Sequence, residues 1–253
     1  MDILRAIVMA FSMFSTIPMP HIQWDERNMR YMMAAFPLVG AVIGLLVWGW
    51  QLLAQALGFG TILTGAGYTL IPIVVTGGIH MDGFADVMDA QSSHASPERR
   101  QRIMRDPHIG AFAAIAVACY LIAYFALACE LPIGGPVPLA CIPVISRCLS
   151  GLATVSFRTA REQGMLASEQ ATARTKGVQT ILAVVLAITA SVMLTSAPFV
   201  STAVLLSATG VLAWVKWLAD KHYGGMSGDL AGFYLQVAEL AMLACITVVG
   251  RLV

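Results

Sequence analysis

Residues 77–90 read Gly77-Gly78-Ile79-His80-Met81-Asp82-Gly83-Phe84-Ala85-Asp86-Val87-Met88-Asp89-Ala90. On a helix, the three aspartates of this stretch share one face. Because only 11% of the residues are charged, carboxylates this close together need a partner that offsets their repulsion. A divalent cation does so, and Mg²⁺ prefers carboxylate oxygens shared with the phosphate oxygens of a substrate. The stretch therefore predicts metal-assisted phosphoryl chemistry.

The rest of the chain has the composition of a membrane protein. Hydrophobic residues make up 58% of it, whereas soluble domains have about 45–50% apolar and about 25% charged residues. The formal net charge of +1 gives no reason to expect a nucleic-acid partner. The N-terminal apolar run lacks a cleavage-site pattern and is not a convincing cleavable signal. The five cysteines lie in apolar stretches and form no CxxC pair, so we assign them no metal and no disulfide.

Seven stretches have the length and apolarity of transmembrane helices, which need about 20 residues. The expected spans are 31–57, 61–79, 109–130, 136–156, 177–196, 198–219 and 230–250. Residues 1–19 are apolar but short, which favours a re-entrant or interfacial helix over a full crossing. We therefore predict an all-α fold, a polytopic integral membrane bundle of about seven transmembrane helices plus this N-terminal helix. Residues 1–253 form one domain in this interpretation.

The basic residues fall on one side of this topology. With the N-terminus in the cytoplasm, the inside segments are 1–30, 80–108, 157–176 and 220–229. They contain twelve of the fifteen Lys and Arg residues, which is the asymmetry that the positive-inside rule requires. The prediction is a multi-pass protein of the cytoplasmic (inner) membrane whose active site faces the cytoplasm.

The first long inside segment continues past the aspartates with a basic stretch. Ser96 and Pro97 predict the start of a short helix. The charges of Glu98–Arg102 are more typical of a solvated helix face than of a site. Farther on, Arg105 and Asp106 precede the next span. Asp106 either caps that helix or adds a metal ligand.

Three further residues have more than one interpretation. His80 is a candidate base, metal ligand or substrate contact because it stands next to the aspartates, although a lone histidine is more often structural. Arg147 and Glu239 lie inside expected spans, where a charge is costly, so both should face the bundle interior. They either pair with each other or contact a phosphate or the substrate.

The last inside segment reads Lys221-His222-Tyr223-Gly224-Gly225-Met226-Ser227-Gly228-Asp229. A glycine-rich turn before a helix presents backbone N–H groups to an anion, and Lys221 and Ser227 are suited to add to such a site. A flexible loop with Asp229 as the N-cap explains the same pattern equally well.

Taken together and in this order, the motifs resemble those of the cobalamin synthase family, the adenosylcobinamide-GDP ribazoletransferases. Phe14–Pro20 is similar to the family's F-x-T-x-I-P-x-P motif, and Gly77–Asp89 to its G-G-x-H-x-D-G-x-A-D-x-x-D motif. Ile103–Asp106, Ser146–Arg147 and Gly224–Asp229 follow in the family's order. The resemblance covers most of the chain.

The resemblance implies a Mg²⁺-dependent transferase that joins adenosylcobinamide-GDP to α-ribazole, or to its 5′-phosphate, and releases GMP. Its partners would be these two small molecules and membrane lipid, with a homo-oligomer left open. The implied metal ligands are Asp82, Asp86 and Asp89, with Asp106 and Asp229 as secondary ligands. The implied catalytic residues are His80, Asp82, Arg102 and Arg105. The implied substrate-binding residues are Arg147, Lys221, Gly224, Gly225 and Ser227.

Two other classes of protein remain as alternatives. A CDP-alcohol phosphotransferase also carries a D-G-x-x-A motif, but that pattern usually places Arg after the alanine, whereas Asp86 follows Ala85 here. A cation transporter would line a pore with the aspartates. Against it, the carboxylates cluster toward one face of the membrane rather than near its midplane.

Overall fold

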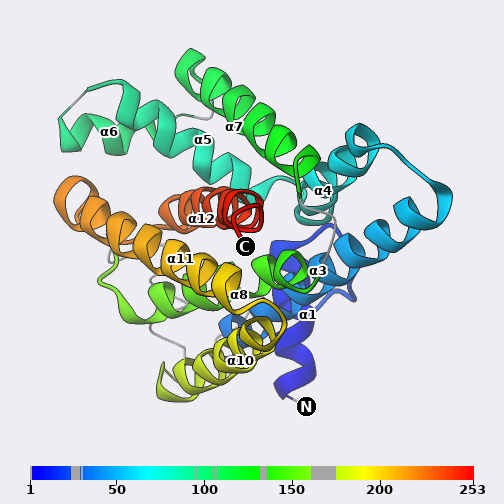
Figure 1. Cartoon of the computed structure of the whole chain (residues 1–253). Coiled ribbons are helices and arrows are strands. Elements are labelled where there is room, and N and C mark those ends of the chain that lie inside the picture. The colour runs from blue at the N-terminus through cyan, green and yellow to red at the C-terminus, as the bar shows by residue number, and fades with distance from the viewer. Residues whose placement is uncertain are drawn as a thin grey trace.

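The computed structural model describes residues 2–23, 29, 31–94, 96–104, 106, 108–131, 136–160 and 175–253. Its helices are α1 (Asp2–Phe14), α3 (Met32–Leu57), α4 (Thr61–Thr76), α5 (Ile79–Ser92), α6 (Pro97–Ile103), α7 (Ala111–Cys129), α8 (Pro136–Ser156), α10 (Thr175–Ser196), α11 (Pro198–Leu218), the π-helical turn η1 (Ala219–Tyr223) and α12 (Gly228–Val249) (Figure 1). Within these ranges the one β-type pairing is an isolated bridge between Thr159 and Met226. The predicted all-α fold is confirmed.

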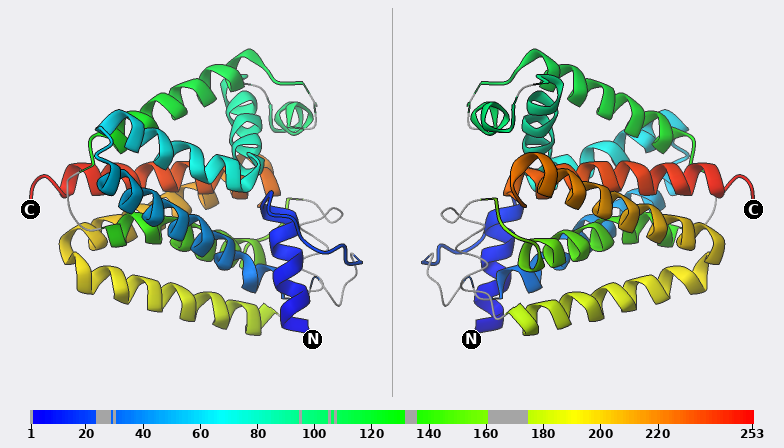
Figure 2. Two further views of the ribbon diagram at one scale, coloured as in Figure 1. Left: turned by 90° about the vertical axis from the view of Figure 1, so that its right-hand side faces the viewer. Right: turned by 90° about the vertical axis from the view of Figure 1, so that its left-hand side faces the viewer.

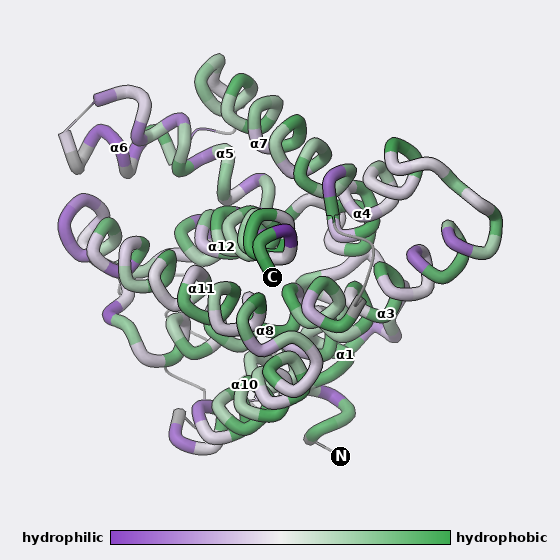
Figure 3. Tube along the Cα trace, viewed as in Figure 1, coloured by the Kyte–Doolittle hydropathy of each residue, from purple (hydrophilic) through white to green (hydrophobic). Residues whose placement is uncertain are grey.

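The long helices form a bundle around α12. In the described part of the chain, six helices are long and apolar enough to cross a membrane, or up to seven if α4 and α5 count as one bent span. Of the six, α8 and α12 are the most buried, and α12 lies in the middle of the bundle (Figure 1). α7, α10 and α11 instead expose apolar side chains such as Ile122, Ile188 and Leu206. Hydrophobic residues predominate along these three helices (Figure 3). An apolar outer surface of this extent suits lipid rather than water, so the chain is a polytopic α-helical membrane protein.

α1 and α5 run across the other helices at one end of the bundle, and the C-terminus lies at the opposite end (Figure 2). α1 has 13 residues, which gives about 20 Å at 1.5 Å per residue. That length falls short of the roughly 30 Å hydrocarbon core of a bilayer. The structure therefore agrees with an N-terminal helix that does not cross.

The expected span 61–79 needs correction at its end. α4 stops at Thr76 and α5 leaves it at an angle of 95°. The bend occurs because Gly77 and Gly78 have φ values of +63° and +80°, a left-handed conformation that terminates helices and favours glycine. Thr16, which follows α1, donates its backbone N–H to Val75 O (2.8 Å) and its hydroxyl to Val74 O (2.9 Å). These bonds hold the last carbonyls of α4.

Replacing Gly77 by alanine should lower stability and activity together. A Cβ at this position would lie 2.8 Å from Thr16 Cγ2, and the left-handed conformation alone costs about 1–2 kcal/mol for an L-residue. Thermal unfolding in detergent measures the loss. The matched control is Gly49→Ala, because a Cβ at Gly49 meets nothing within 4 Å. Equal melting temperatures for the two variants would show that the bend is not held as described.

Candidate functional site

Four carboxylates gather where α5 meets the start of α12. We call Asp82, Asp86, Asp89 and Asp229 the aspartate cluster. The pKa of Asp86 is raised to about 6, first by burial and then by the negative charges of the other three. The predicted helix for the three α5 aspartates is confirmed. A residue from another helix, 140 positions along the chain from Asp89 (229 − 89), completes the group.

A close crossing of α5 and α12 brings this group together. A Cβ at Gly83 would lie only 2.8 Å from Asp229 O and 3.0 Å from Asp229 Cα. Real side chains essentially never approach backbone atoms this closely, so glycine is required for the two helices to touch there. The sequence around Gly83 therefore places the α5 carboxylates beside the first turn of α12.

The aspartate cluster has the donor chemistry that a hard divalent cation requires. Carboxylate oxygens suit Mg²⁺, which keeps several positions for water or substrate phosphate. Among the described residues, no three His, Cys, Asp or Glu side chains already stand at ligand distance. The aspartates therefore have donor atoms suited to a divalent cation, but they do not form a ligand set in this structure.

Asp89 packs against the N-cap of α7. Gly110 is that N-cap, and a Cβ on it would overlap the Asp89 carboxylate oxygens. Gly110→Ala should therefore turn the Asp89 carboxylate aside and reduce turnover about tenfold without lowering the melting temperature, since a short side chain at the helix end can rotate away. Steady-state rates and thermal unfolding check this. Gly210→Ala, with open space at its Cβ, is the control. A turnover equal to that control would mean that the position of Asp89 does not matter.

Asp106 is exposed in the turn before α7 and is bonded locally. Its Oδ1 accepts hydrogen bonds from the His108 backbone N–H (3.0 Å) and pairs with His108 Nδ1 (2.7 Å). These bonds, the side-chain one first, hold the pKa of Asp106 below its usual value. Because Gly110 caps α7, the interpretation of Asp106 as its N-cap is wrong. The carboxylate instead closes a local turn before the helix.

The basic residues of α6 differ from one another. Arg102 is exposed, as is Arg99, whereas Arg105 lies outside the described residues. Ser96 is the N-cap, with Pro97 in the first turn, as predicted. Arg100 is half-buried, so the interpretation of 98–102 as a solvated face is wrong for this residue. Sequence reasoning missed it because its neighbours on the chain are equally basic.

The glycine-rich loop is held internally. Gly224 and Gly225 have φ values of +75° and +141°. The amide of Gly225 donates to Ala219 O (3.1 Å) and that of Met226 to Arg158 O (2.8 Å), so neither is available to an anion in this conformation. Ser227 is the N-cap of α12, and its hydroxyl accepts the Leu230 N–H at 3.2 Å.

One residue near this loop differs from what the pattern indicated, and another makes a contact that the pattern did not specify. The interpretation of Asp229 as the N-cap is wrong, because Ser227 fills that place and Asp229 lies in the first turn of α12. Lys221 is exposed, with Nζ 4.7 Å from the centre of the Trp217 ring. This cation–π contact leaves its ammonium group at the surface of the site.

His80 lies on the far side of α5 from Asp82. The two residues are two positions apart, which is about 200° around a helix. Asp82 is exposed, whereas His80 is buried and packs on the rings of Phe14 and Phe36 at centroid distances of 6.1 and 5.7 Å. His80 is close to Asp82 in the sequence, but α5 separates their side chains.

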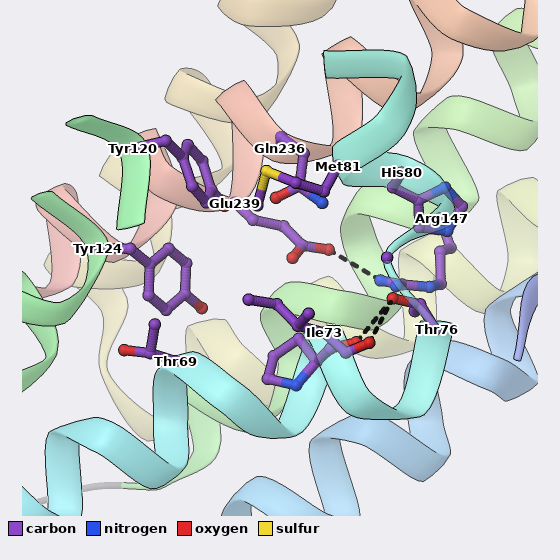
Figure 4. Close-up of a pocket in the computed structure, with 12 residues that line it drawn as sticks. Thr69, Ile73, Thr76, His80, Met81, Tyr120, Tyr124, Arg147, Gln236 and Glu239 are labelled. Carbon is purple, nitrogen blue, oxygen red and sulfur yellow. Dashed lines mark hydrogen bonds and ion pairs between the residues drawn. The ribbon is translucent and has the colours of Figure 1, made fainter. Parts of the chain in front are cut away.

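His80 instead lines a polar pocket beneath α5 (Figure 4). Arg147 and Glu239 meet there, with Arg147 Nη1 2.8 Å from Glu239 Oε1 and both side chains buried. The Ser146 hydroxyl donates to the same oxygen at 2.7 Å. The mutual pair that the sequence allowed is confirmed. It joins α8 to α12 inside the bundle.

The pocket is nearly filled by its own side chains. Tyr120, Tyr124 and Gln236 contribute further polar groups to it (Figure 4). Its free volume of about 10 Å³ is about the room that one water molecule needs. The pocket therefore serves as a buried polar core in this conformation, and the open, charged aspartate cluster is the better candidate active site.

Fold and site together define a polytopic helical membrane protein with a carboxylate-rich site at one end of its bundle. The family model for cobalamin-5-phosphate synthase matches residues 6–247. The chain belongs to this family and is an enzyme, a transferase of cobalamin synthesis.

Proteins named adenosylcobinamide-GDP ribazoletransferase are similar to nearly the whole chain. That of Lachnoclostridium phytofermentans is 41% identical over 251 residues, covering 99% of this chain and 96% of the relative. That of Clostridium botulinum (strain Alaska E43) is 32% identical over 255 residues, covering 97% and 98%. That of Geobacillus thermodenitrificans is 32% identical over 241 residues, covering 92% and 91%. No solved structure matches the chain.

Proposed function

We propose that this enzyme joins adenosylcobinamide-GDP to α-ribazole, or to its 5′-phosphate, and releases GMP, with Mg²⁺ at the aspartate cluster. The observation that carries the proposal is the placement of Asp82, Asp86 and Asp89 on α5, which crosses closely over Asp229 in the first turn of α12. Family membership supplies the substrates, because the named relatives act on adenosylcobinamide-GDP.

The reaction is a phosphodiester exchange. A ribose hydroxyl oxygen of the ribazole forms a bond to the phosphorus that carries the cobinamide. The bond from that phosphorus to the bridging oxygen of the diphosphate breaks, and GMP leaves with the bonding electrons. The hydroxyl proton passes to a base. Little covalent chemistry is asked of the protein, so positioning and charge neutralisation carry most of the catalysis.

The roles follow from the chemistry of each side chain. Bound Mg²⁺ would supply charge neutralisation and orientation of the diphosphate. Asp82, Asp86 and Asp89 would hold it, with Asp229 as a further ligand. Asp106, whose Oδ1 is bonded to His108, would support the turn before α7 instead. An aspartate of the cluster is a better candidate for the base than His80, which points to the other side of α5.

The basic residues and the glycine-rich loop would contact the substrate. Arg102, Arg105 and Lys221 would neutralise phosphate oxygens. Gly224, Gly225 and Ser227 would line the substrate side of the site. Their groups that already form hydrogen bonds within the protein would not bind the substrate. Arg147 is buried in its pair with Glu239, so its contribution would be to the bundle that carries the site.

The site would face the cytoplasm in a cell (inner) membrane. α1, α5, α6 and η1 lie at the same end of the bundle (Figure 2), and the Lys and Arg residues of those segments make that end basic. A basic end is retained on the cytoplasmic side. Soluble nucleotide substrates are available there.

Turnover of the purified protein tests the proposal. The protein in nanodiscs receives adenosylcobinamide-GDP and α-ribazole, and GMP and the cobalamin product are quantified together. Equal amounts of both are expected, with Mg²⁺ present and not with chelator. GMP without cobalamin would indicate hydrolysis instead. Cation flux into liposomes without a nucleotide substrate would support the transport alternative.

A further inference from the structure

The side chain of Arg100 is half-buried. Its Nε and Nη1 atoms are shielded from solvent and have no hydrogen-bond partner among the described residues. The neighbouring Arg99 and Arg102 on the same short helix are exposed. Buried N–H groups without an acceptor are costly, so these two atoms indicate that an acceptor, and most favourably an anionic one, belongs beside them.

α6, which carries Arg100, packs against η1. Burial and then the charges of Arg100 and Lys221 lower the pKa of His222. Burial raises the pKa of Tyr223, and the charge of Arg100 opposes that rise. π-helical turns of this kind are rare and occur frequently at functional sites. We call Arg100, Lys221 and His222 the basic site.

The basic site adjoins the aspartate cluster. α6 packs against both α5 and η1, and η1 is followed in the chain by residues 224–228 and then by Asp229. The carboxylates and the two cations, Arg100 and Lys221, therefore lie on neighbouring elements at this end of the bundle, with His222 as a neutral hydrogen-bonding side chain between α6 and the loop. A phosphate group that shares a divalent cation with the carboxylates has its other oxygens free for a guanidinium, which binds phosphate with two parallel N–H···O bonds.

We propose that Arg100, with Lys221 and His222 around it, binds a phosphate group of the nucleotide substrate between α6 and η1. The proposal rests on the proposed function for the identity of the nucleotide. Arg100 donates its buried N–H groups to phosphate oxygens and thereby gains the partners that it lacks. It was absent from the candidate residues that the sequence indicated.

Binding of GDP, measured without turnover, tests the proposal independently of the reaction. Wild-type protein, Arg100→Ala, Arg100→Lys and Arg99→Ala are placed in phosphatidylcholine nanodiscs and titrated with GDP in the presence of Mg²⁺. Arg100→Ala should bind GDP at least about tenfold more weakly, since charge-assisted hydrogen bonds are lost. Arg100→Lys should fall between, because it keeps the charge without the planar fork. Arg99→Ala should bind like wild type.

Equal weakening in Arg99→Ala and Arg100→Ala would overturn the assignment, because it would reduce the effect to the overall charge of α6. Unchanged binding in Arg100→Ala would overturn it directly. A second arm repeats the titration with phosphatidylglycerol in the nanodisc and measures co-purified phosphatidylglycerol for each variant. If Arg100→Ala loses the lipid but keeps its affinity for GDP, the phosphate at this site is a lipid headgroup and the nucleotide assignment is wrong. If wild type binds GDP through Arg100 but forms no cobalamin, the site stands and the proposed reaction fails.

Discussion

Asp82→Asn should reduce turnover at saturating substrate by at least a hundredfold while the protein remains folded. Asp82 is exposed at the start of α5, so its removal costs no packing. Its negative charge contributes to the raised pKa of Asp86, so the substitution also relieves repulsion within the aspartate cluster. Loss of one metal ligand removes several kcal/mol of transition-state stabilisation, and each factor of ten corresponds to about 1.4 kcal/mol.

Glu130→Gln is the matched control for this variant. Glu130 is an exposed carboxylate at the other end of the bundle, where it pairs with Arg251. Both variants remove one negative charge, and an exposed ion pair contributes little to stability. Turnover and melting temperature are measured for each. Near-normal turnover in Asp82→Asn, or an equal loss in Glu130→Gln, would contradict the proposed role of the cluster.

Glu239→Ala should destabilise the protein by about 3–5 kcal/mol, because it leaves the Arg147 guanidinium buried without its counter-charge. Arg147 is 1% exposed and Glu239 is 3% exposed, so solvent cannot replace the lost partner. Thermal unfolding in detergent measures the effect. The same variant should reduce activity through unfolding, with little change in the affinity of the remaining folded fraction for GDP.

The double variant Arg147→Met with Glu239→Leu tests whether the unpaired charge of Arg147 causes the loss of stability in Glu239→Ala. Replacing both partners by apolar residues removes the unpaired charge, so most of the stability lost in Glu239→Ala should return. If the double variant is no more stable than Glu239→Ala, the destabilisation has another cause than the buried charge of Arg147.

Much of the fold could be predicted from the sequence, because a lipid bilayer constrains the length and polarity of each span. A span must be apolar for about 20 residues, and the bounds of α3, α7, α8, α10, α11 and α12 agree closely with the expected ones. The place of the aspartates followed from helical periodicity alone. The early end of α4 was less accessible, since two adjacent glycines are compatible with a helix interior as well as with a sharp bend.

The residues of the site could be predicted only in part, because tertiary contacts bring them together. Asp229 joins the α5 aspartates through a close helix crossing that no local pattern specifies. His80 was linked to Asp82 by adjacency in the chain, although helical geometry puts the two side chains on different faces. Arg100 differs from Arg99 only through the contact of α6 with η1, which lies more than a hundred residues farther along the chain.

Metal binding at the aspartate cluster is the central claim, and electron paramagnetic resonance of Mn²⁺ tests it most directly. Mn²⁺ substitutes for Mg²⁺ at oxygen-rich sites. Wild-type protein, Asp82→Asn, Asp86→Asn and Glu130→Gln are titrated with Mn²⁺ in nanodiscs with GDP present. The account predicts bound Mn²⁺ in wild type and Glu130→Gln and a loss of at least about tenfold in affinity in both aspartate variants. Equal Mn²⁺ binding in all four proteins would contradict it.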